Sequence, residues 1–266
     1  MRAQLPPMKK ILPLLSASLA ILCSTGTAQT ASPADKPAAS ATTMAPVVVD
    51  ASAPMPKTGN ATFFKKHERF LARAKSGPIG VLFLGDSITE GWAQAPHIWD
   101  HYYAKYEPAN FGIGGDHTEH VIWRIENGEL NGISPKVIVL MLGTNNSAQN
   151  TGAQIAAADK KIVEMIRSRL PGTKVLLLAI FPRGPRQSGG KAEPWEQRMA
   201  VIGAANTELA KLDDGANVRF LNINARFMGN DGTIPNIIMP DQLHPNAAGY
   251  QLWAEAMQPL LTEMVR

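Results

Sequence analysis

The chain has 266 residues, of which 45% are hydrophobic and 18% are charged. This composition is typical of a folded globular protein and excludes an intrinsically disordered one. The formal charge of +4 comes without a dense basic cluster that could follow a phosphate backbone, so nucleic-acid binding is not expected. The single cysteine, Cys23, lies in the N-terminal apolar stretch, so a chain cleaved beyond it would carry no disulfide and no cysteine metal site.

The N-terminus has the pattern of an export signal. Two lysines precede an apolar run over residues 11–23, and Gly26-Thr27-Ala28 offers the small residues that a signal peptidase requires. We therefore predict a signal peptide over residues 1–28, a periplasmic or secreted protein, and no stable membrane insertion after cleavage. Residues 29–59 are rich in Ala and Pro and are predicted to be a disordered linker, followed by one domain over residues 60–266.

Apolar runs and amphipathic stretches alternate along this domain. The runs are bounded by Gly, Pro or charge, and most lack polar alternation, as in strands buried on both faces of a parallel sheet. They lie at Ile79–Leu84, Ala109–Ile113, Lys136–Leu142, Lys174–Ile180 and Val218–Ile223. Helical spacing is found at Phe63–Ala74, His117–Asn127, Ile155–Arg169, Glu196–Leu212 and Ala247–Val265. This order predicts an α/β fold, a three-layer α/β/α sandwich with a mostly parallel five-stranded sheet and its site at the carboxyl ends of the strands.

Two segments carry the groups of a serine hydrolase. Ser87 follows the first strand in the turn Gly85–Gly91, where the start of a helix would stabilise negative charge. Asp241 stands three residues before His244, and Pro245 keeps this pair out of a helix. A hydroxyl becomes a nucleophile beside a base, and the base needs a carboxylate to orient it. Taken alone, the serine could be a helix cap, and the Asp-His pair could be a loop hydrogen bond or half a metal site.

Two further turns could supply donors for an oxyanion. Phe111–Asp116 is rich in glycine, which allows a backbone N–H to approach a substrate closely. Leu142–Asn146 offers a side-chain amide. The glycine run also resembles a phosphate-binding loop, but it lacks the Gly-Lys-Ser/Thr ending of a P-loop.

Four such turns in this order resemble the Ser, Gly, Asn and His motif blocks of the GDSL/SGNH hydrolases, and within that family they are most similar to the catalytic subunits of platelet-activating-factor acetylhydrolase. The resemblance implies a flavodoxin-like SGNH hydrolase fold. It also implies that Ser87 is the nucleophile and first oxyanion donor, that Gly115 and Asn145 are the other donors, and that Asp241 and His244 complete a catalytic triad. Ile88 stands where the family motif has Leu. The shared stretches are Lys66–Phe70, Asn110–Asp116, His120–Arg124, Glu126–Leu130 and Gly143–Asn146.

The resemblance further assigns an acyl pocket to Ile88, Thr144 and Leu243, whose bulk favours a short acyl group. We therefore expect a carboxylic ester hydrolase of acetylesterase type that needs no cofactor, with O-acetyl groups on carbohydrate as its expected substrates. Two alternatives stay open: an acyltransferase with the same triad and a non-catalytic carbohydrate-binding module. The resembled subunits associate, so a homodimer is also possible.

Other polar residues have weaker claims to a role. His97, Asp100 and His101 have helical spacing that could hold a metal, but no third protein ligand is evident, and we expect no metal site. His117 and His120 follow the glycine turn and could line the rim of the pocket or cap a helix. The segment Phe181–Pro194 has no periodicity and is predicted to be a long loop that either covers the site or binds a polar substrate.

Overall fold

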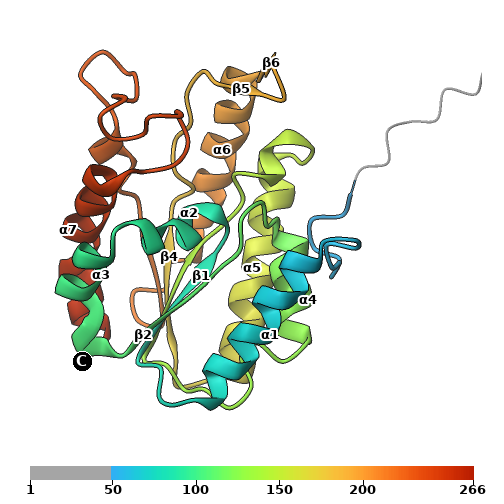
Figure 1. Ribbon diagram of the computed structural model, residues 1–266, viewed down its shortest axis with the longest axis vertical. Helices are drawn as coiled ribbons and strands as arrows, with labels where there is room; N and C mark the ends of the chain where they lie inside the picture. Colours follow the sequence, from blue (N-terminus) through green and yellow to red (C-terminus); the bar gives the residue numbers. More distant parts are fainter. Residues whose placement is uncertain (1–48) are drawn as a thin grey trace, which may run out of the picture. The chain divides into compact units, whose positions relative to one another are not determined.

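A computed structural model describes residues 49–266. The predicted signal peptide and most of the predicted linker lie outside the described residues. Five parallel strands form the central sheet in the order β2-β1-β3-β4-β7 (Figure 1). Their bounds are β1 Val81–Gly85, β2 Pro108–Gly112, β3 Val137–Met141, β4 Lys174–Leu178 and β7 Val218–Leu221.

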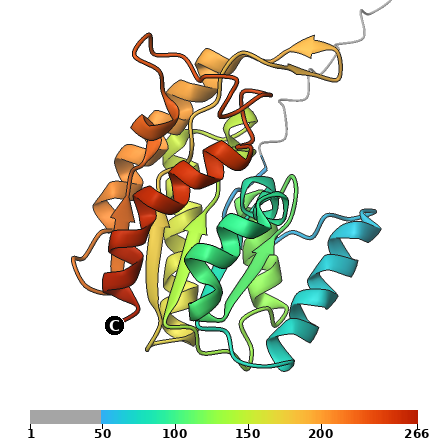
Figure 2. The same cartoon turned by 60° about the vertical axis from the view of Figure 1, so that its left-hand side comes forward.

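Helices cover both faces of the sheet, because the residues of the inner strands β1, β3 and β4 alternate between two apolar cores. Leu82 and Leu84 are buried in the core on the side of α1, α4, α5 and α6, whereas Val81 and Phe83 are buried in the core on the side of α3 and α7. Figure 2 shows these layers from the side of α3 and α7. The helices are α1 Ala61–Lys75, α2 Ser87–Glu90, α3 Pro96–Tyr103, α4 Thr118–Glu126, α5 Gly152–Arg169, α6 Trp195–Leu209 and α7 Ala247–Met264.

The predicted three-layer α/β/α fold with a five-stranded parallel sheet is confirmed. The segment Phe181–Pro194, predicted to be a plain loop, contains a short antiparallel hairpin of β5 Gln187–Ser188 and β6 Lys191–Ala192. This hairpin projects beyond the end of the sheet at which α2 begins (Figure 1). Single turns of 3-10 helix at Gly91–Gln94, Ala104–Tyr106, Asn146–Ala148, Ala210–Leu212 and Asn224–Phe227 complete the fold.

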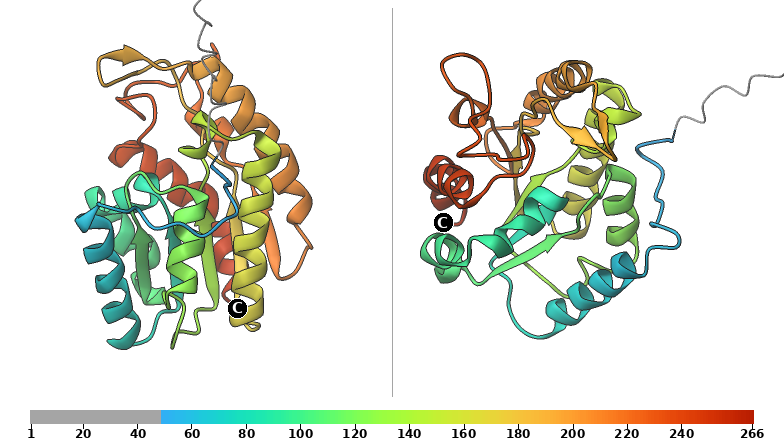
Figure 3. Two further views of the ribbon diagram at one scale, coloured as in Figure 1. Left: turned by 90° about the vertical axis from the view of Figure 1, so that its right-hand side faces the viewer. Right: turned by 45° about the horizontal axis from the view of Figure 1, so that its top comes forward.

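The described end of the predicted linker, residues 49–59, is held against the domain and is not a free tether (Figure 3). The carbonyl of Ala51 accepts a hydrogen bond from Thr118 Oγ1 at 2.8 Å, and that of Ser52 accepts one from Lys161 Nζ at 2.8 Å. Lys57 forms an ion pair of 2.7 Å with the buried Asp116. Together with the buried side chain of Ala51, these polar contacts hold the segment, so residues before the expected boundary at residue 60 pack with the domain.

Within residues 49–266, the helices are too short or too polar to cross a lipid bilayer.

Candidate active site

Ser87 is the first residue of α2, directly after β1. The cap of this helix is Asp86, whose Oδ1 accepts a hydrogen bond from the N–H of Ile88 at 2.9 Å, so the alternative role of the serine as the cap is taken by its neighbour. A first-turn N–H such as that of Ser87 has no acceptor inside its own helix. The Ser87 hydroxyl and N–H are therefore both available at the carboxyl end of the sheet. Asp86 is fully buried, and this burial raises the pKa of its carboxyl to about 7.

The structure brings Ser87, His244 and Asp241 into one hydrogen-bonded chain across 157 residues of sequence. Ser87 Oγ lies 2.9 Å from His244 Nε2, and His244 Nδ1 lies 2.7 Å from Asp241 Oδ2. In this arrangement the carboxylate accepts the Nδ1 proton and leaves Nε2 free to take the hydroxyl proton. The histidine and the aspartate side chains are 37% and 43% exposed, so a substrate can reach them from solvent.

The turn that carries the histidine is fixed by short-range hydrogen bonds. Asp241 Oδ1 accepts the backbone N–H groups of Leu243 at 3.1 Å and His244 at 2.7 Å. Gln242 between them has a φ of 61° and accepts a backbone hydrogen bond from Gly184 at 2.8 Å, which joins this turn to the loop after β4.

Hydrogen bonding and charge also hold Asp241 ionised. Partial burial acts to raise its pKa, but the two hydrogen bonds from His244, the attraction to its imidazole when that ring is protonated, and the positive charge of Arg186 outweigh it, so the pKa is lowered.

Gly115 and Asn145 lie on the two turns expected to supply oxyanion donors. Gly115 has a φ of +70°, a conformation that residues with a Cβ seldom adopt, and this turns its peptide in the glycine loop. Asn145 Nδ2 donates one hydrogen bond of 2.8 Å to the carbonyl of Asp116, which joins the two turns. Because a side-chain amide carries two N–H donors, the second hydrogen of Asn145 is left for a ligand.

A buried charge cluster around Arg124 of α4 lies beneath these turns, where the sequence favours helix packing with a salt-bridged guanidinium over contact with substrate. Its guanidinium donates to the carbonyls of Phe111 at 2.9 Å and Gly85 at 3.3 Å, which lie at the ends of β2 and β1. It also pairs with Asp116 at 3.1 Å and Glu129 at 2.8 Å, and all three side chains are 0% exposed. A planar guanidinium has enough donors to hold four acceptors at once, so Arg124 fixes the nucleophile strand and the glycine turn together.

Among the described residues, the three side chains His117, Glu119 and His120 are close enough to hold a metal ion, whereas His97, Asp100 and His101, whose helical spacing was considered above, form no such group. Hydrogen bonds already occupy atoms of His117, Glu119 and His120 that would bind the metal. His120 Nδ1 accepts the N–H of His117 at 2.9 Å, and burial lowers the pKa of His120 to about 4. A neutral imidazole that accepts at one nitrogen carries its proton on the other, so His120 offers no free ligand atom. These residues cap α4, in line with one of the two roles weighed above.

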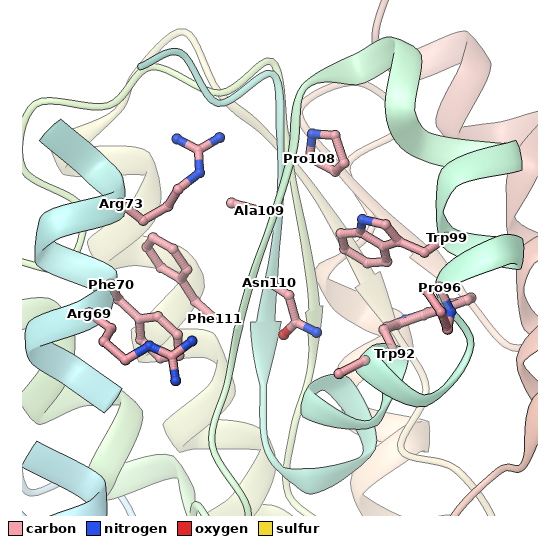
Figure 4. Close-up of a pocket in the computed structure, with 11 residues that line it drawn as sticks. Arg69, Phe70, Arg73, Trp92, Pro96, Trp99, Pro108, Ala109, Asn110 and Phe111 are labelled. Carbon is pink, nitrogen blue, oxygen red and sulfur yellow. The ribbon is translucent and has the colours of Figure 1, made fainter. Parts of the chain in front are cut away.

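A groove of about 370 Å³ lies apart from these residues, over the edge strand β2 between α1 and α3 (Figure 4). Phe70 and Phe111 lie on one side of β2 and Trp92 and Trp99 on the other. The lining includes none of the site residues expected from sequence, so the groove is separate from the candidate active site. It is lined by Arg69, Phe70, Arg73, Trp92, Ala93, Pro96, Trp99, Pro108, Ala109, Asn110 and Phe111.

Comparison with known proteins agrees with this geometry. The model of the GDSL-like lipase/acylhydrolase family matches residues 83–252. The chain is 36% identical to the platelet-activating factor acetylhydrolase IB subunit alpha2 of Rattus norvegicus over 208 residues, which cover 78% of this chain and 86% of the relative. It is 35% identical to the alpha1 subunit of Homo sapiens over 207 residues, with the same coverage of both chains.

Solved structures agree on the fold. A GDSL-like lipase from Bacteroides thetaiotaomicron superposes with a TM-score of 0.59 at 20% identity, over 75% of this chain and 98% of that one. The chain therefore belongs to the GDSL-like lipase/acylhydrolase family and is a carboxylic ester hydrolase.

Proposed function

We propose that this esterase hydrolyses short-chain esters, in particular O-acetyl groups on carbohydrate, through an acyl-enzyme on Ser87. The observation that supports an acyl-enzyme is the continuous hydrogen-bonded chain from Ser87 Oγ through His244 to Asp241, with separations of 2.9 and 2.7 Å. Hydroxyl, imidazole and carboxylate in this order are what nucleophilic acyl transfer requires.

Each of these groups has a role in the proposed hydrolysis. His244 Nε2 takes the Ser87 proton while Oγ attacks the ester carbonyl, whose oxygen becomes the oxyanion. The N–H groups of Ser87 and Gly115 and the free amide hydrogen of Asn145 are the proposed donors to that oxygen. The intermediate collapses when the C–O bond to the alcohol breaks and the imidazolium returns its proton to the leaving alkoxide. Water then attacks the acyl-enzyme by the same route and releases the acid.

The three side chains assigned to the acyl pocket support a short acyl group, because each adjoins Ser87, Asn145 or His244 in the chain and is buried. Ile88 and Thr144 are 0% exposed, and Leu243 is 4% exposed. Arg183 donates to the hydroxyl of Thr144 at 3.3 Å, which restrains that side chain. The curated relatives are named acetylhydrolases, in agreement with a two-carbon acyl group.

The test of this proposal is turnover of a 4-nitrophenyl ester series from acetate to octanoate by the wild-type chain and by Ser87→Ala. We expect rapid acetate hydrolysis that falls with acyl length and is lost in the variant. Release of acetate from acetylated xylan or acetylated chito-oligosaccharides would then identify the carbohydrate. Equal turnover of octanoate would contradict the short acyl pocket, and turnover that survives Ser87→Ala would contradict the nucleophile.

Export is a second part of the proposal and is supported by the N-terminal sequence. The basic pair, the apolar run over residues 11–23 and the small residues before Gln29 form the pattern of a cleaved signal. Acetylated polysaccharide outside the cytoplasm would then be the material met by the mature chain. N-terminal sequencing of the exported protein should begin at Gln29, and a retained Met1 would contradict cleavage.

A further inference from the structure

Three arginines and one glutamate, contributed by the loop between β4 and α6 and by α6 itself, lie together beside the candidate active site. Arg183 and Arg186 precede the β5–β6 hairpin, Glu193 follows it, and Arg198 lies in α6. Glu193 contacts all three guanidinium groups: Oε2 accepts from Arg183 and, at 2.9 Å, from Arg198, and Oε1 lies 3.5 Å from Arg186. A backbone hydrogen bond of 3.0 Å from Glu193 to Arg186 closes the base of the hairpin.

Two of these arginines hold the turn that carries Asn145. Arg183 donates to the carbonyl of Thr144 at 3.3 Å, and Arg198 donates to the same carbonyl at 3.0 Å and to the Asn145 carbonyl at 3.5 Å. Arg198 Nε also donates to Ser147 Oγ at 3.0 Å. The side chain of Arg183 is 1% exposed and that of Arg198 is 12% exposed, so solvent does little to replace these hydrogen bonds.

The third arginine reaches the other half of the site. Arg186 lies 3.3 Å from Asp241 Oδ2, the same oxygen that lies 2.7 Å from His244 Nδ1. A cation at this distance stabilises the ionised carboxylate of Asp241. Arg186 therefore acts on the charge of the Asp241–His244 pair as well as on its position.

We infer that Glu193 is a positioning residue that fixes the oxyanion-donor turn and the acid-base pair relative to each other, an inference that rests on the proposed function. Three guanidinium groups would repel one another without a shared carboxylate. Burial and the charge of Arg198 already lower the pKa of Arg183 to about 10 against the opposing effect of Glu193. When the charge of Glu193 is removed, the three arginines separate and the carbonyls of Thr144 and Asn145 lose their donors. The side-chain amide of Asn145 then shifts from its place.

The first test is Glu193→Gln, which keeps the shape and removes the charge, beside the control Glu196→Gln in the exposed first turn of α6. With 4-nitrophenyl acetate we expect kcat to fall roughly tenfold to hundredfold, the scale of a misplacement of about 1 Å, while KM changes less than about threefold. The control should keep the wild-type values. A melting temperature lowered with kcat unchanged would overturn the inference, because it would make Glu193 a purely structural residue.

The pH profile gives a second readout that a purely structural role would not change. Arg186→Gln removes a positive charge beside Asp241, so the acid limb of kcat/KM should move to higher pH, by about half a unit for a partly exposed pair. Glu193→Gln removes a negative charge and should move it to lower pH. The matched control is Lys191→Gln, an exposed lysine of the same hairpin, and it should leave the limb in place.

Unshifted profiles in both variants would overturn the inference. If Glu193→Gln does not fold, the test is the pH profile of Arg186→Gln alone, and an acid limb that stays in place would overturn the inference. The wild-type assay separates the two proposals. If there is no Ser87-dependent turnover, the proposed function is overturned. If the wild-type enzyme is active and Glu193→Gln is equally active with an unchanged pH profile, only the positioning role is overturned.

Discussion

The two halves of the candidate active site are built in opposite ways. The half that carries Ser87 and the glycine turn rests on Arg124 and Asp116, whose side chains are 0% exposed. The half that carries Asp241 and His244 is 43% and 37% exposed and is held by hydrogen bonds within four residues and by Arg186. The buried half fixes donor geometry through charges that water cannot reach. The exposed half leaves the base open to substrate and to protons.

The largest effect is expected from a substitution in the exposed half. His244→Ala removes the proposed general base and should lower kcat/KM for 4-nitrophenyl acetate about 10⁴-fold or more. The melting temperature should change little, because the side chain is half-exposed. Since Ser87 and His244 act as a unit, the double variant with Ser87→Ala should be no less active than either single variant. Losses that multiply in the double variant would show that the two residues act independently.

The next largest effect is expected from a substitution in the buried half. Arg124→Gln removes the guanidinium that the buried carboxylates of Asp116 and Glu129 share and leaves Asp116 paired with Lys57 alone, which should cost roughly 3–5 kcal/mol of unfolding free energy. For a domain of this size the melting temperature should fall by about 6–20 °C, measured by calorimetry. The control is Arg226→Gln, which breaks an exposed ion pair of 3.7 Å and should stay within about 0.5 kcal/mol. Equal stabilities for the two variants would contradict the contrast between the halves.

A third change separates catalysis from stability within the buried half. Asn145→Ala removes a proposed oxyanion donor and one hydrogen bond, so kcat should fall about 10²- to 10³-fold while stability falls by about 1 kcal/mol. The exposed Asn131 provides the control Asn131→Ala, for which we expect no change in kcat. A fall in stability with kcat preserved would make Asn145 a link between the two turns and not a donor.

Sequence predicted the parts of this site that follow strand ends. Ser87 and Asn145 each come directly after a buried apolar run, and the geometry of a parallel sheet collects such positions at one edge. Asp241 and His244 are marked by their spacing and by Pro245. The proximity of these segments therefore followed from the alternation of strands and helices.

The charges that hold these parts together could not be predicted in the same way. Arg186 and Glu193 meet only because a hairpin of two-residue strands folds between them, and no periodicity marks it. The pairing of Lys57 with Asp116 spans 59 residues and lies in a segment whose composition indicates a free linker. Burial of a charged side chain depends on its partners, and single-sequence patterns report apolar burial alone.

The smallest expected effect sharpens the comparison through pH. Burial raises the pKa of Asp86 to about 7, above the ordinary value of 3.8 that we take for the unfolded chain. A carboxyl with a raised folded pKa contributes stability that is complete below the unfolded pKa and is lost as pH rises through about 7. Asp86→Asn removes this titration, and the amide oxygen can still accept the N–H of Ile88 as a helix cap. The melting temperature of the variant relative to wild type should therefore rise by several degrees between pH 5 and pH 8. Asp100→Asn, at an exposed position of α3, should show a constant difference. A constant difference for Asp86→Asn as well would mean that the carboxyl beside the nucleophile titrates like one in solvent, and the nucleophile half would then be less dry than the geometry implies.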